Sequence, residues 1–522
     1  MAALPPPGAF GLPSKFTSWR PNQSEAIVRG LDSPQRFVVP VCPTGFGKSL
    51  LYMTMAVLKG GRTLILTSTK GLQTQLLEDF KDMGAVDIRG RNAYLCPLEH
   101  DGTTCDHGAC VADIECDRKL KGGCPYYDQL RLAKVAPIVI TNYTYWMYQN
   151  VHGGGLGVDF TTVVCDEAHN TPDHVTSFLT VVMDRSEEVI KSVLPTDPSK
   201  LTFTEWRKWA SEKKPVIGEE LRIMHKLVKD GFTDRVLRKR ISRLMMLKKN
   251  LDYVIEADLG TWVSDVSRYA VTFAPIWPAK DCEEVLFGGV KRVVLTSASI
   301  CSKTLEVLGI EESVCEFMEY PHSFPVENRL LTHIPTVRMN YRATPMELRQ
   351  WVTRIDQIIR GRQDRKGIIH TVSYKRRDMV MANSEFSDIM LTHESRNTEA
   401  MVERFKAAKP PAVLVSPSMS TGWDFPYDAA KYQIIGKLGY PNTKDTIVAA
   451  RAKQDKDYTS YMAMQQLVQA AGRGVRAVDD MCETLVIDDN IIWFMQRYKE
   501  FAPQWFRDAY VRRRTIPQAP AL

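Results

Sequence analysis

A glycine-bearing loop near the N-terminus carries the residue types that bind nucleotide phosphates. Residues 43–49 read Pro-Thr-Gly-Phe-Gly-Lys-Ser, after an apolar run and before a helical pattern at 50–58. Glycines let backbone N–H groups wrap phosphates at the positive end of a helix, while Lys48 supplies a charge and Ser49 a hydroxyl for Mg²⁺. The strict pattern has glycine where Cys42 stands, so the loop alone only indicates such a site. The residues expected to contact nucleotide are Pro43, Thr44, Gly45, Phe46, Gly47, Lys48 and Ser49.

Two adjacent carboxylates follow the apolar segment that ends at Cys165. Asp166 can hold Mg²⁺ through its water shell, and Glu167 can polarise the water that attacks a γ-phosphate. His169 is expected to couple this site to the neighbouring strand. A solvated carboxylate pair that caps a helix is the alternative, and the upstream phosphate loop argues against it.

Two arginines near the C-terminus, Arg473 and Arg476, follow Gln469 and lie three residues apart. This spacing puts both on one face of a helix. From there they can reach across a domain boundary to the γ-phosphate, where the transition state gathers charge. Surface salt bridging is the alternative. The candidate catalytic residues are Lys48, Asp166, Glu167, Gln469, Arg473 and Arg476.

Five of the eleven cysteines are concentrated between residues 96 and 124. Because the N-terminus lacks the form of a signal peptide, a metal or cluster site in a reducing compartment is favoured over disulfides. A four-iron cluster needs four thiolates, and a four-cysteine zinc site or unligated thiols are the alternatives. The candidate ligands, four of which would be used, are Cys96, Cys105, Cys110, Cys116 and Cys124.

Short apolar runs, each followed by a helical pattern, predict buried parallel strands that would position these residues. The first set covers 37–41, 63–67, 137–141, 162–165 and 292–296, and the second covers 366–371, 412–416, 432–435 and 483–488. Two α/β sheets are therefore expected. Between the sets, residues 184–253 have few strand signals, and Leu237, Ile241 and Leu244 recur at helical spacing, which predicts a small helical insertion.

Composition narrows the class of protein without giving its function. Hydrophobic residues at 44% and charged residues at 25% are those of an ordinary globular protein. The net charge of +7 permits a nucleic-acid partner without demonstrating one. No apolar run reaches the roughly 18 residues that cross a bilayer, so we expect no membrane association. We expect a cytoplasmic protein, in a bacterial, archaeal or viral setting.

Taken in order, the motifs resemble those of superfamily 2 helicases, and in detail the XPD/DinG branch of iron–sulfur DNA helicases. The segments that carry the resemblance are 20–23, 43–49, 90–96, 141–143, 163–169, 296–300, 422–426, 437–441 and 469–476. Three residues, Cys42, Ser299 and Gly439, depart from the family pattern without touching a catalytic atom. The helical insertion is short for the arch domain of this family, which leaves its role in strand separation open.

The resemblance implies an α/β fold of two RecA-like parallel-sheet helicase domains with an inserted Fe–S cluster domain and a small helical arch. Helicase domain 1 would comprise residues 1–95, 137–183 and 254–305, and helicase domain 2 would comprise 306–522. The cluster insertion would occupy 96–136, and the arch 184–253. By the same resemblance, Cys96 and Cys124 match the outer ligands of a [4Fe-4S] cluster.

The resemblance also implies an activity and its cofactors. Gln23 would contact adenine, residues 296–298 would link hydrolysis to domain motion, and Asp424 would sense nucleotide from the second domain. With ATP and Mg²⁺, the chain would move 5′ to 3′ on single-stranded DNA and unwind duplex. We expect a monomer that binds single-stranded DNA and its junctions with duplex; its protein partners are unknown. The alternative function is that of a DNA-stimulated ATPase or translocase that remodels nucleoprotein without unwinding.

Two further groups of residues could contact DNA. The basic residues at 235, 238–240, 243, 248 and 249 could bind phosphates, or form the solvated face of a helix. The aromatic residues Tyr126, Tyr127, Tyr143, Tyr145 and Trp146 could stack on bases, or pack in the core. From a different class, a nucleotide-gated binding module would dispense with Glu167 or the arginine pair, and this sequence has both.

Overall fold

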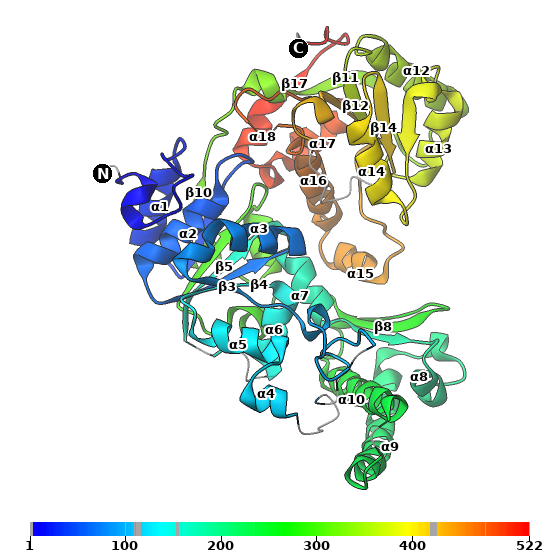
Figure 1. Cartoon of the computed structure of the whole chain (residues 1–522). Coiled ribbons are helices and arrows are strands. Elements are labelled where there is room, and N and C mark those ends of the chain that lie inside the picture. Colours follow the sequence, from blue (N-terminus) through cyan, green and yellow to red (C-terminus); the bar gives the residue numbers. More distant parts are fainter. Residues whose placement is uncertain are drawn as a thin grey trace.

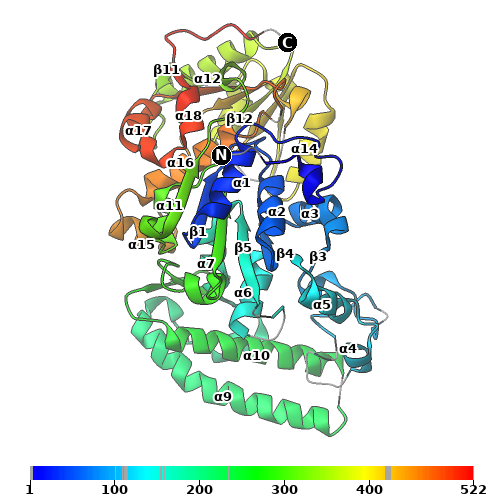
Figure 2. The same ribbon diagram turned by 90° about the vertical axis from the view of Figure 1, so that its left-hand side faces the viewer.

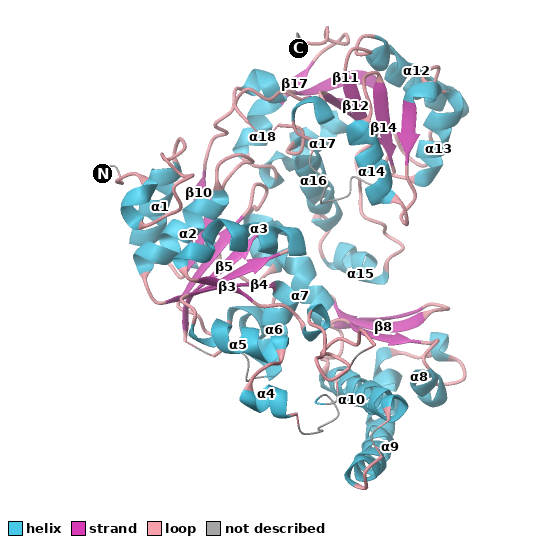
Figure 3. Cartoon of the chain, viewed as in Figure 1, coloured by secondary structure: helices cyan, strands magenta, loops and turns pink. Residues whose placement is uncertain are grey.

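Two parallel β-sheets organise the chain, and each has seven strands among the described residues. The structure is a computed structural model that describes residues 4–520, except 100, 109, 111–115, 153–155, 158, 233, 418–424 and 476. Figures 1 and 3 show the first sheet in the lower half of the molecule and the second in the upper half. The two RecA-like domains expected from the sequence are confirmed.

The first sheet has the order β10-β1-β9-β5-β2-β4-β3, with neighbouring strands parallel. Its strands are β1 (Phe37–Val41), β2 (Arg62–Thr67), β3 (Ala85–Asp87), β4 (Ile138–Asn142), β5 (Phe160–Asp166), β9 (Arg292–Thr296) and β10 (Cys315–Glu319). Its helices are α1 (Gln23–Asp32), α2 (Lys48–Lys59), α3 (Lys70–Phe80), α6 (Tyr143–His152), α7 (Thr171–Leu179) and α11 (Ser302–Val307). Strands β1 and β9 are buried along their whole length, which explains the apolar sequence of β1 and the apolar centre of β9.

The second sheet has the order β13-β14-β12-β15-β16-β11-β17, again parallel. Its strands are β11 (Leu331–Val337), β12 (Lys366–His370), β13 (Met390–Thr392), β14 (Ala412–Ser416), β15 (Tyr432–Ile435), β16 (Glu483–Asp488) and β17 (Tyr510–Arg512). Its helices are α12 (Pro345–Arg360), α13 (Tyr374–Asn383), α14 (Thr398–Ala407), α15 (Thr446–Gln454), α16 (Tyr458–Ala471), α17 (Asn490–Tyr498) and α18 (Gln504–Ala509).

The strands expected from apolar runs all form, with ends within two residues of those expected. The sequence did not reveal β3, β10, β13 and β17, which lie at sheet edges, where burial is weaker. It also did not reveal β11, which contains Pro335 next to an irregularity in its pairing with β16. Proline in a strand is tolerated at such a place but obscures the pattern. Since β10 pairs with β1, the first sheet continues past residue 305, where the sequence placed the domain boundary.

A helical insertion projects from the first domain, as Figure 2 shows along its lower edge. It contains α8 (Glu188–Val193), α9 (Phe203–Lys229) and α10 (Arg235–Glu256). Trp206 and Leu221 of α9 and Ile241 and Leu244 of α10 are buried in one core cluster, so the helical spacing marked the packed face correctly. An antiparallel sheet joins this insertion to the domain: β6 (Val181–Asp184), β8 (Ala270–Pro275) and β7 (Trp262–Val266).

The cysteine-bearing insertion lies between β3 and β4 and contains α4 (Asp117–Lys121) and α5 (Pro125–Val135). Arg238 of α10 donates to Glu99 of this insertion at 2.7 Å, so the two insertions touch each other. Among the described residues, no helix has the length and apolar character needed to span a membrane.

Candidate ATP site between the two sheets

The loop between β1 and α2 has the backbone that a phosphate-binding loop needs. Gly45 and Gly47 have φ angles of 80° and 84°, a region that residues with a side chain rarely adopt. Gly47 is the N-cap of α2, so the N–H groups of Lys48 and Ser49 lie at the positive end of this helix. The loop can therefore surround an anion with backbone donors and one lysine.

Two buried side chains brace this loop from outside. Gln23 donates from Nε2 to the carbonyls of Gly47 at 2.9 Å and Phe46 at 3.3 Å. Phe324, in the segment that connects the two sheets, packs so closely that a Cβ on Gly45 would lie 2.1 Å from its Cζ. Gln23 was expected to contact adenine, and in this structure it holds the loop. No motif surrounds Phe324, so its role could not be predicted from the sequence.

Strand β5 ends at Asp166, and Asp166 and Glu167 lie beside the lysine of the phosphate loop. Lys48 Nζ lies 3.3 Å from Glu167 Oε1. Asp166 accepts a hydrogen bond of 3.3 Å from the hydroxyl of Tyr52, which the sequence analysis missed. Tyr52 lies four residues after Lys48 on α2, and that spacing places both side chains on one helical face.

Burial and charge shift the pKa values at this point. Burial, with the nearby Glu167 carboxylate, raises the pKa of Asp166 to about 7. Burial alone would lower the pKa of Lys48, but the carboxylates of Glu167 and Asp166 outweigh it and raise that pKa. Lys48 therefore stays charged. Two carboxylates that share one lysine form an environment that a divalent cation would neutralise.

His169 connects the carboxylates to the neighbouring strand end. Its Nδ1 lies 2.8 Å from Ser297 Oγ and 3.3 Å from Glu167 Oε2. Ser297 follows β9, and β9 pairs in parallel with β5, so the carboxyl ends of the two strands bring these residues together. Burial lowers the pKa of His169 to about 4, so its ring is neutral at neutral pH.

Helix α16 of the second domain closes the other side of the site. Gln469 donates from Nε2 to Ser299 Oγ at 2.7 Å, in the segment that follows β9. Thr44 Oγ1 of the phosphate loop donates to the carbonyl of Gly472 at 3.3 Å. The phosphate loop and the end of α16 are therefore in direct contact.

Arg473 follows these contacts in the chain. Burial lowers the pKa values of His169 and His370, and the positive charge of Arg473 contributes to the lowering at both rings, so Arg473 lies near His169 of the first domain and His370 of the second. Arg476 and Asp424 lie outside the described residues, and their expected roles are not tested. The structure thus brings together the other candidate catalytic residues, from two sheets.

The cysteines of the insertion occupy one neighbourhood. Cys96, Cys105, Cys116 and Cys124 are buried, and Cys110 is half-buried. Burial raises the pKa of Cys105 to about 12, with contributions from the thiols of Cys124, Cys96 and Cys110. Burial also raises the pKa of Cys110, which Cys116 and Cys124 influence. Even so, nowhere in the described part of the chain do three or more His, Cys, Asp or Glu side chains form a group that could hold a metal ion.

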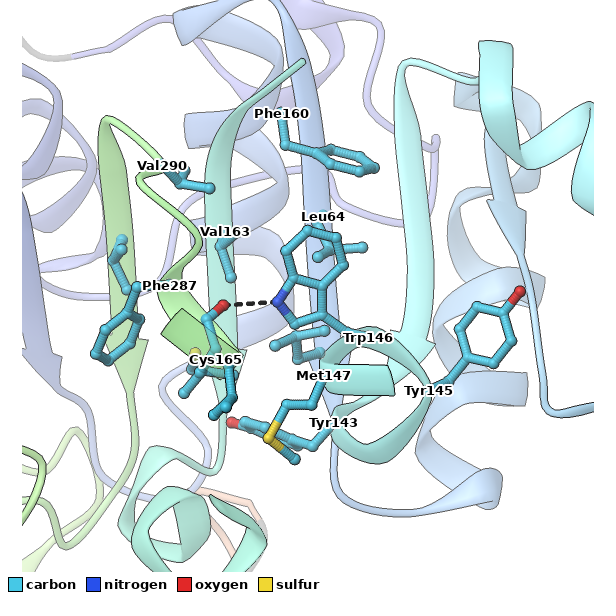
Figure 4. Close-up of a cluster of buried hydrophobic side chains, with 14 of the residues drawn as sticks. Leu64, Tyr143, Tyr145, Trp146, Met147, Phe160, Val163, Cys165, Phe287 and Val290 are labelled. Atoms are coloured by element: carbon cyan, nitrogen blue, oxygen red, sulfur yellow. Dashed lines mark hydrogen bonds between the residues drawn. The ribbon is translucent and has the colours of Figure 1, made fainter. Parts of the chain in front are cut away.

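Most of the aromatic residues considered for base stacking are core residues. Tyr126, Tyr143, Tyr145 and Trp146 are each less than 8% exposed. Figure 4 shows Trp146 inside the first domain, where its indole N–H donates to the carbonyl of Leu286 at 2.6 Å. This burial favours core packing over base stacking for these four residues.

The basic stretch on α10 is largely engaged with protein groups. Arg240 pairs with Glu220 of α9 at 2.6 Å, and Arg238 pairs with Glu99. Lys249 lies 4.7 Å from the ring centre of Tyr148. These contacts favour the solvated-face interpretation of the stretch over a dedicated phosphate-binding role.

Comparisons with known proteins agree with this geometry. Residues 20–200 match the DEAD/DEAH box helicase family model, and residues 359–509 match the helicase C-terminal domain model. None of the curated protein sequences matches the chain. The two models match parts of the chain that contribute strands to both sheets, and the chain belongs to the superfamily 2 helicases.

Solved structures narrow the relationship. A structure titled "XPD_Helicase" matches with a TM-score of 0.67 and 14% identity, covering 95% of this chain and 100% of that one. A structure of S. tokodaii Xpd4 matches with a TM-score of 0.57 and 14% identity, covering 94% of this chain and 100% of that one. In overall fold, the chain resembles these XPD helicase structures.

Proposed function

We propose that this chain is an ATP-dependent DNA helicase that moves 5′ to 3′ on single-stranded DNA and unwinds duplex in replication, repair or recombination. The observation that carries the proposal is that Gln469 of the second domain donates to Ser299 of the first, next to the Ser297 that contacts His169, while Lys48 pairs with Glu167 in the first domain. A site completed by two domains changes shape as ATP binds and is hydrolysed. That motion is what translocation requires.

Each residue then has a defined task in hydrolysis. Lys48 and the loop N–H groups hold the β- and γ-phosphates, and Glu167 orients the attacking water and accepts its proton. Arg473, with Arg476, offsets charge on the γ-phosphate in the transition state. Ser49 and Asp166 would hold Mg²⁺, which neutralises phosphate charge. The acidic pair beside a single lysine fits that ion.

Two hydrogen bonds connect the chemistry to domain motion. His169 binds Ser297, and Gln469 binds Ser299 from the opposite domain. Both serines belong to the segment that follows β9, so a change at Glu167 reaches the second domain within a few residues. This supports the link between hydrolysis and motion that the segment 296–298 was expected to supply.

A cavity beside the cysteine-bearing insertion, with several cationic side chains in its lining, supports nucleic-acid binding. Its volume is about 350 Å³, and its lining includes Lys70, Arg89, Arg91, Asn92 and Tyr148. Three cations around an opening suit a phosphate backbone. Tyr148 is 49% exposed, unlike its buried neighbours, and offers a ring to a base. We propose that a single strand passes here, toward its junction with duplex.

We also propose that four of the five cysteines, Cys96, Cys105, Cys110, Cys116 and Cys124, hold a [4Fe-4S] cluster. Five cysteines lie within one short insertion, and four of them are buried there; this supports the proposal, because thiolates are the ligands that such clusters use. When bound, the cluster would hold the insertion rigid. Iron and sulfide analysis of anaerobically purified protein tests the assignment; zinc without iron would refute it.

Strand displacement on duplexes with either a 5′ or a 3′ single-stranded tail tests the main proposal. We expect ATP-dependent displacement of the 5′-tailed duplex alone, and none with Glu167→Gln, which keeps the shape of the side chain but cannot accept the proton. DNA-stimulated hydrolysis without displacement on either tail would instead favour a translocase that remodels nucleoprotein. We further propose that the protein acts as a monomer in the cytoplasm. Sedimentation at the working concentration tests the oligomeric state.

A further inference from the structure

Arg451 of α15 is a buried cation that crosses from the second domain into the first. Arg451 is only 3% exposed to solvent. Nη2 donates to Thr176 Oγ1 of α7 at 2.8 Å, and Nε donates to the carbonyl of Ile276, just after β8. Both acceptors belong to the part of the chain built on the first sheet.

The contact with α7 reaches the ATP site through a short segment. Helix α7 begins at Thr171, directly after the Ala168–Asn170 turn that carries His169. Arg451 also lies near Asp173 of this helix: burial raises the pKa of that carboxyl, and the guanidinium partly offsets the rise. A displacement of α7 therefore moves the turn that follows Asp166 and Glu167.

The contacts of Arg451 within its own domain reach the opposite half of the site. Nη1 donates to the hydroxyl of Tyr458 at 2.8 Å, and Tyr458 is the first residue of α16. The other end of α16 carries Gln469 and leads to Arg473. On the first-domain side, the ring centre of Trp277 lies 5.3 Å from the guanidinium, and its indole N–H donates to Gln454 of α15 at 2.7 Å. Arg451 thus joins α7, which follows Asp166 and Glu167 in the chain, to α16, which leads to Arg473.

Two other contacts between the domains do not join α7 to α16. Lys303 pairs with Asp455 at 2.8 Å, and Thr304 lies 2.9 Å from Tyr461, but both first-domain residues belong to α11. Only Arg451, among the described interdomain hydrogen bonds, reaches α7.

The partners of Arg451 also suit a contact that forms and breaks repeatedly. The groups that accept its hydrogen bonds are a hydroxyl of Thr176, a hydroxyl of Tyr458 and the carbonyl of Ile276, all neutral. Removing a guanidinium from water is costly, and neutral acceptors compensate that cost less than a carboxylate does. Docking is therefore specific in geometry but weak in net free energy.

We propose that Arg451 is a positioning residue that couples closure of the two domains to the ATP site, by docking α15 and α16 onto α7. The proposal rests on the proposed function, since it concerns the same hydrolysis cycle. Arg451 acts through α7 and α16, and the nucleotide contacts belong to other residues.

Hydrogen exchange of the α7 amides, with and without ADP and beryllium fluoride, tests the proposal in the full-length protein. In the wild type we expect the nucleotide analogue to slow exchange across Thr171–Leu179. In Arg451→Met, which keeps an unbranched apolar stem but loses the guanidinium donors, we expect this slowing to fall about 10-fold, the loss of one or two charge-assisted hydrogen bonds. Lys453→Met removes a charge from the exposed face of the same helix and should match the wild type.

Steady-state kinetics separate coupling from a general structural role. For Arg451→Met we expect nucleic-acid-stimulated kcat to fall about 10-fold while KM for ATP and unstimulated hydrolysis stay within about twofold. Thr176→Val, which removes the acceptor and keeps the arginine, should reproduce a smaller part of the loss. Thr176→Val also serves as the test variant if Arg451→Met does not fold.

Equal exchange of α7 in the wild type and Arg451→Met, including no response in either, would overturn the proposal. So would a parallel fall in stimulated and unstimulated hydrolysis. A wild type that nucleic acid does not stimulate would refute the proposed function instead, and the exchange experiment would still decide the role of Arg451.

Discussion

Gly45 offers a quantitative test of how the phosphate loop is held. Its φ of 80° lies in the left-handed region, and a Cβ added there would lie 2.1 Å from Phe324 Cζ. Gly45→Ala therefore meets two separate penalties, one from the backbone and one from the ring. A variant that shortens Phe324 can remove only the second.

The two penalties can be estimated separately. An L-residue in the left-handed region costs about 1–2 kcal/mol, and overlap in a packed site adds about 1–3 kcal/mol. Gly45→Ala should thus destabilise the loop conformation by about 2–5 kcal/mol. Phe324→Leu removes the overlapping ring atoms and should recover about 1–3 kcal/mol in the double variant, although by itself it leaves a small cavity.

Calorimetric titration of ADP into the wild type, Gly45→Ala, Phe324→Leu and the double variant measures the effect. We expect Gly45→Ala to weaken binding at least about 30-fold, and Phe324→Leu to restore a substantial part of it. Thermal unfolding of each protein controls for global destabilisation. If the two changes are additive within about 0.5 kcal/mol, the ring does not brace the loop and the reasoning is refuted.

Three other outcomes are expected. Lys48→Ala removes the cation shared by the two carboxylates and should abolish ATP hydrolysis while circular dichroism is unchanged; retained turnover would contradict its role. Arg362→Ala leaves Glu483, its partner at 2.8 Å, buried without a cation, and should cost about 3–5 kcal/mol of unfolding free energy by denaturant titration; a loss under about 1 kcal/mol would count against that pairing. Trp146→Phe leaves a buried carbonyl without its donor and should cost about 1–3 kcal/mol in the same assay, unless water replaces the indole N–H.

The strands and the phosphate loop were predictable because their signals are local. An apolar run such as 37–41 reports burial on both faces of a sheet, and the loop that follows it needs glycines where φ is positive. Edge strands such as β10 escaped prediction because they are only partly buried and their sequences lack an unbroken apolar run. The first sheet therefore extends farther along the chain than its sequence indicated.

Aromatic residues close together in the sequence differ in burial, and only tertiary packing decided which of them is exposed. Trp146 and Tyr148 are two residues apart, yet the first is 4% exposed and the second 49%. Both are compatible with stacking on a base when read from sequence. Their burial depends on where α6 meets the segment around Leu286, which lies far away in the chain.

By itself, the sequence determined the two sheets, the motifs of a superfamily 2 helicase and the residue types at the ATP site. The tertiary structure decided which of these residues meet: Gln469 with Ser299, Phe324 with Gly45, and Arg451 with α7. Such contacts join segments that are 170 or more residues apart, as for Gln469 and Ser299. Periodicity and turn chemistry act over a few residues, whereas contacts of this kind depend on how two finished domains pack, which leaves no repeating signal in the sequence.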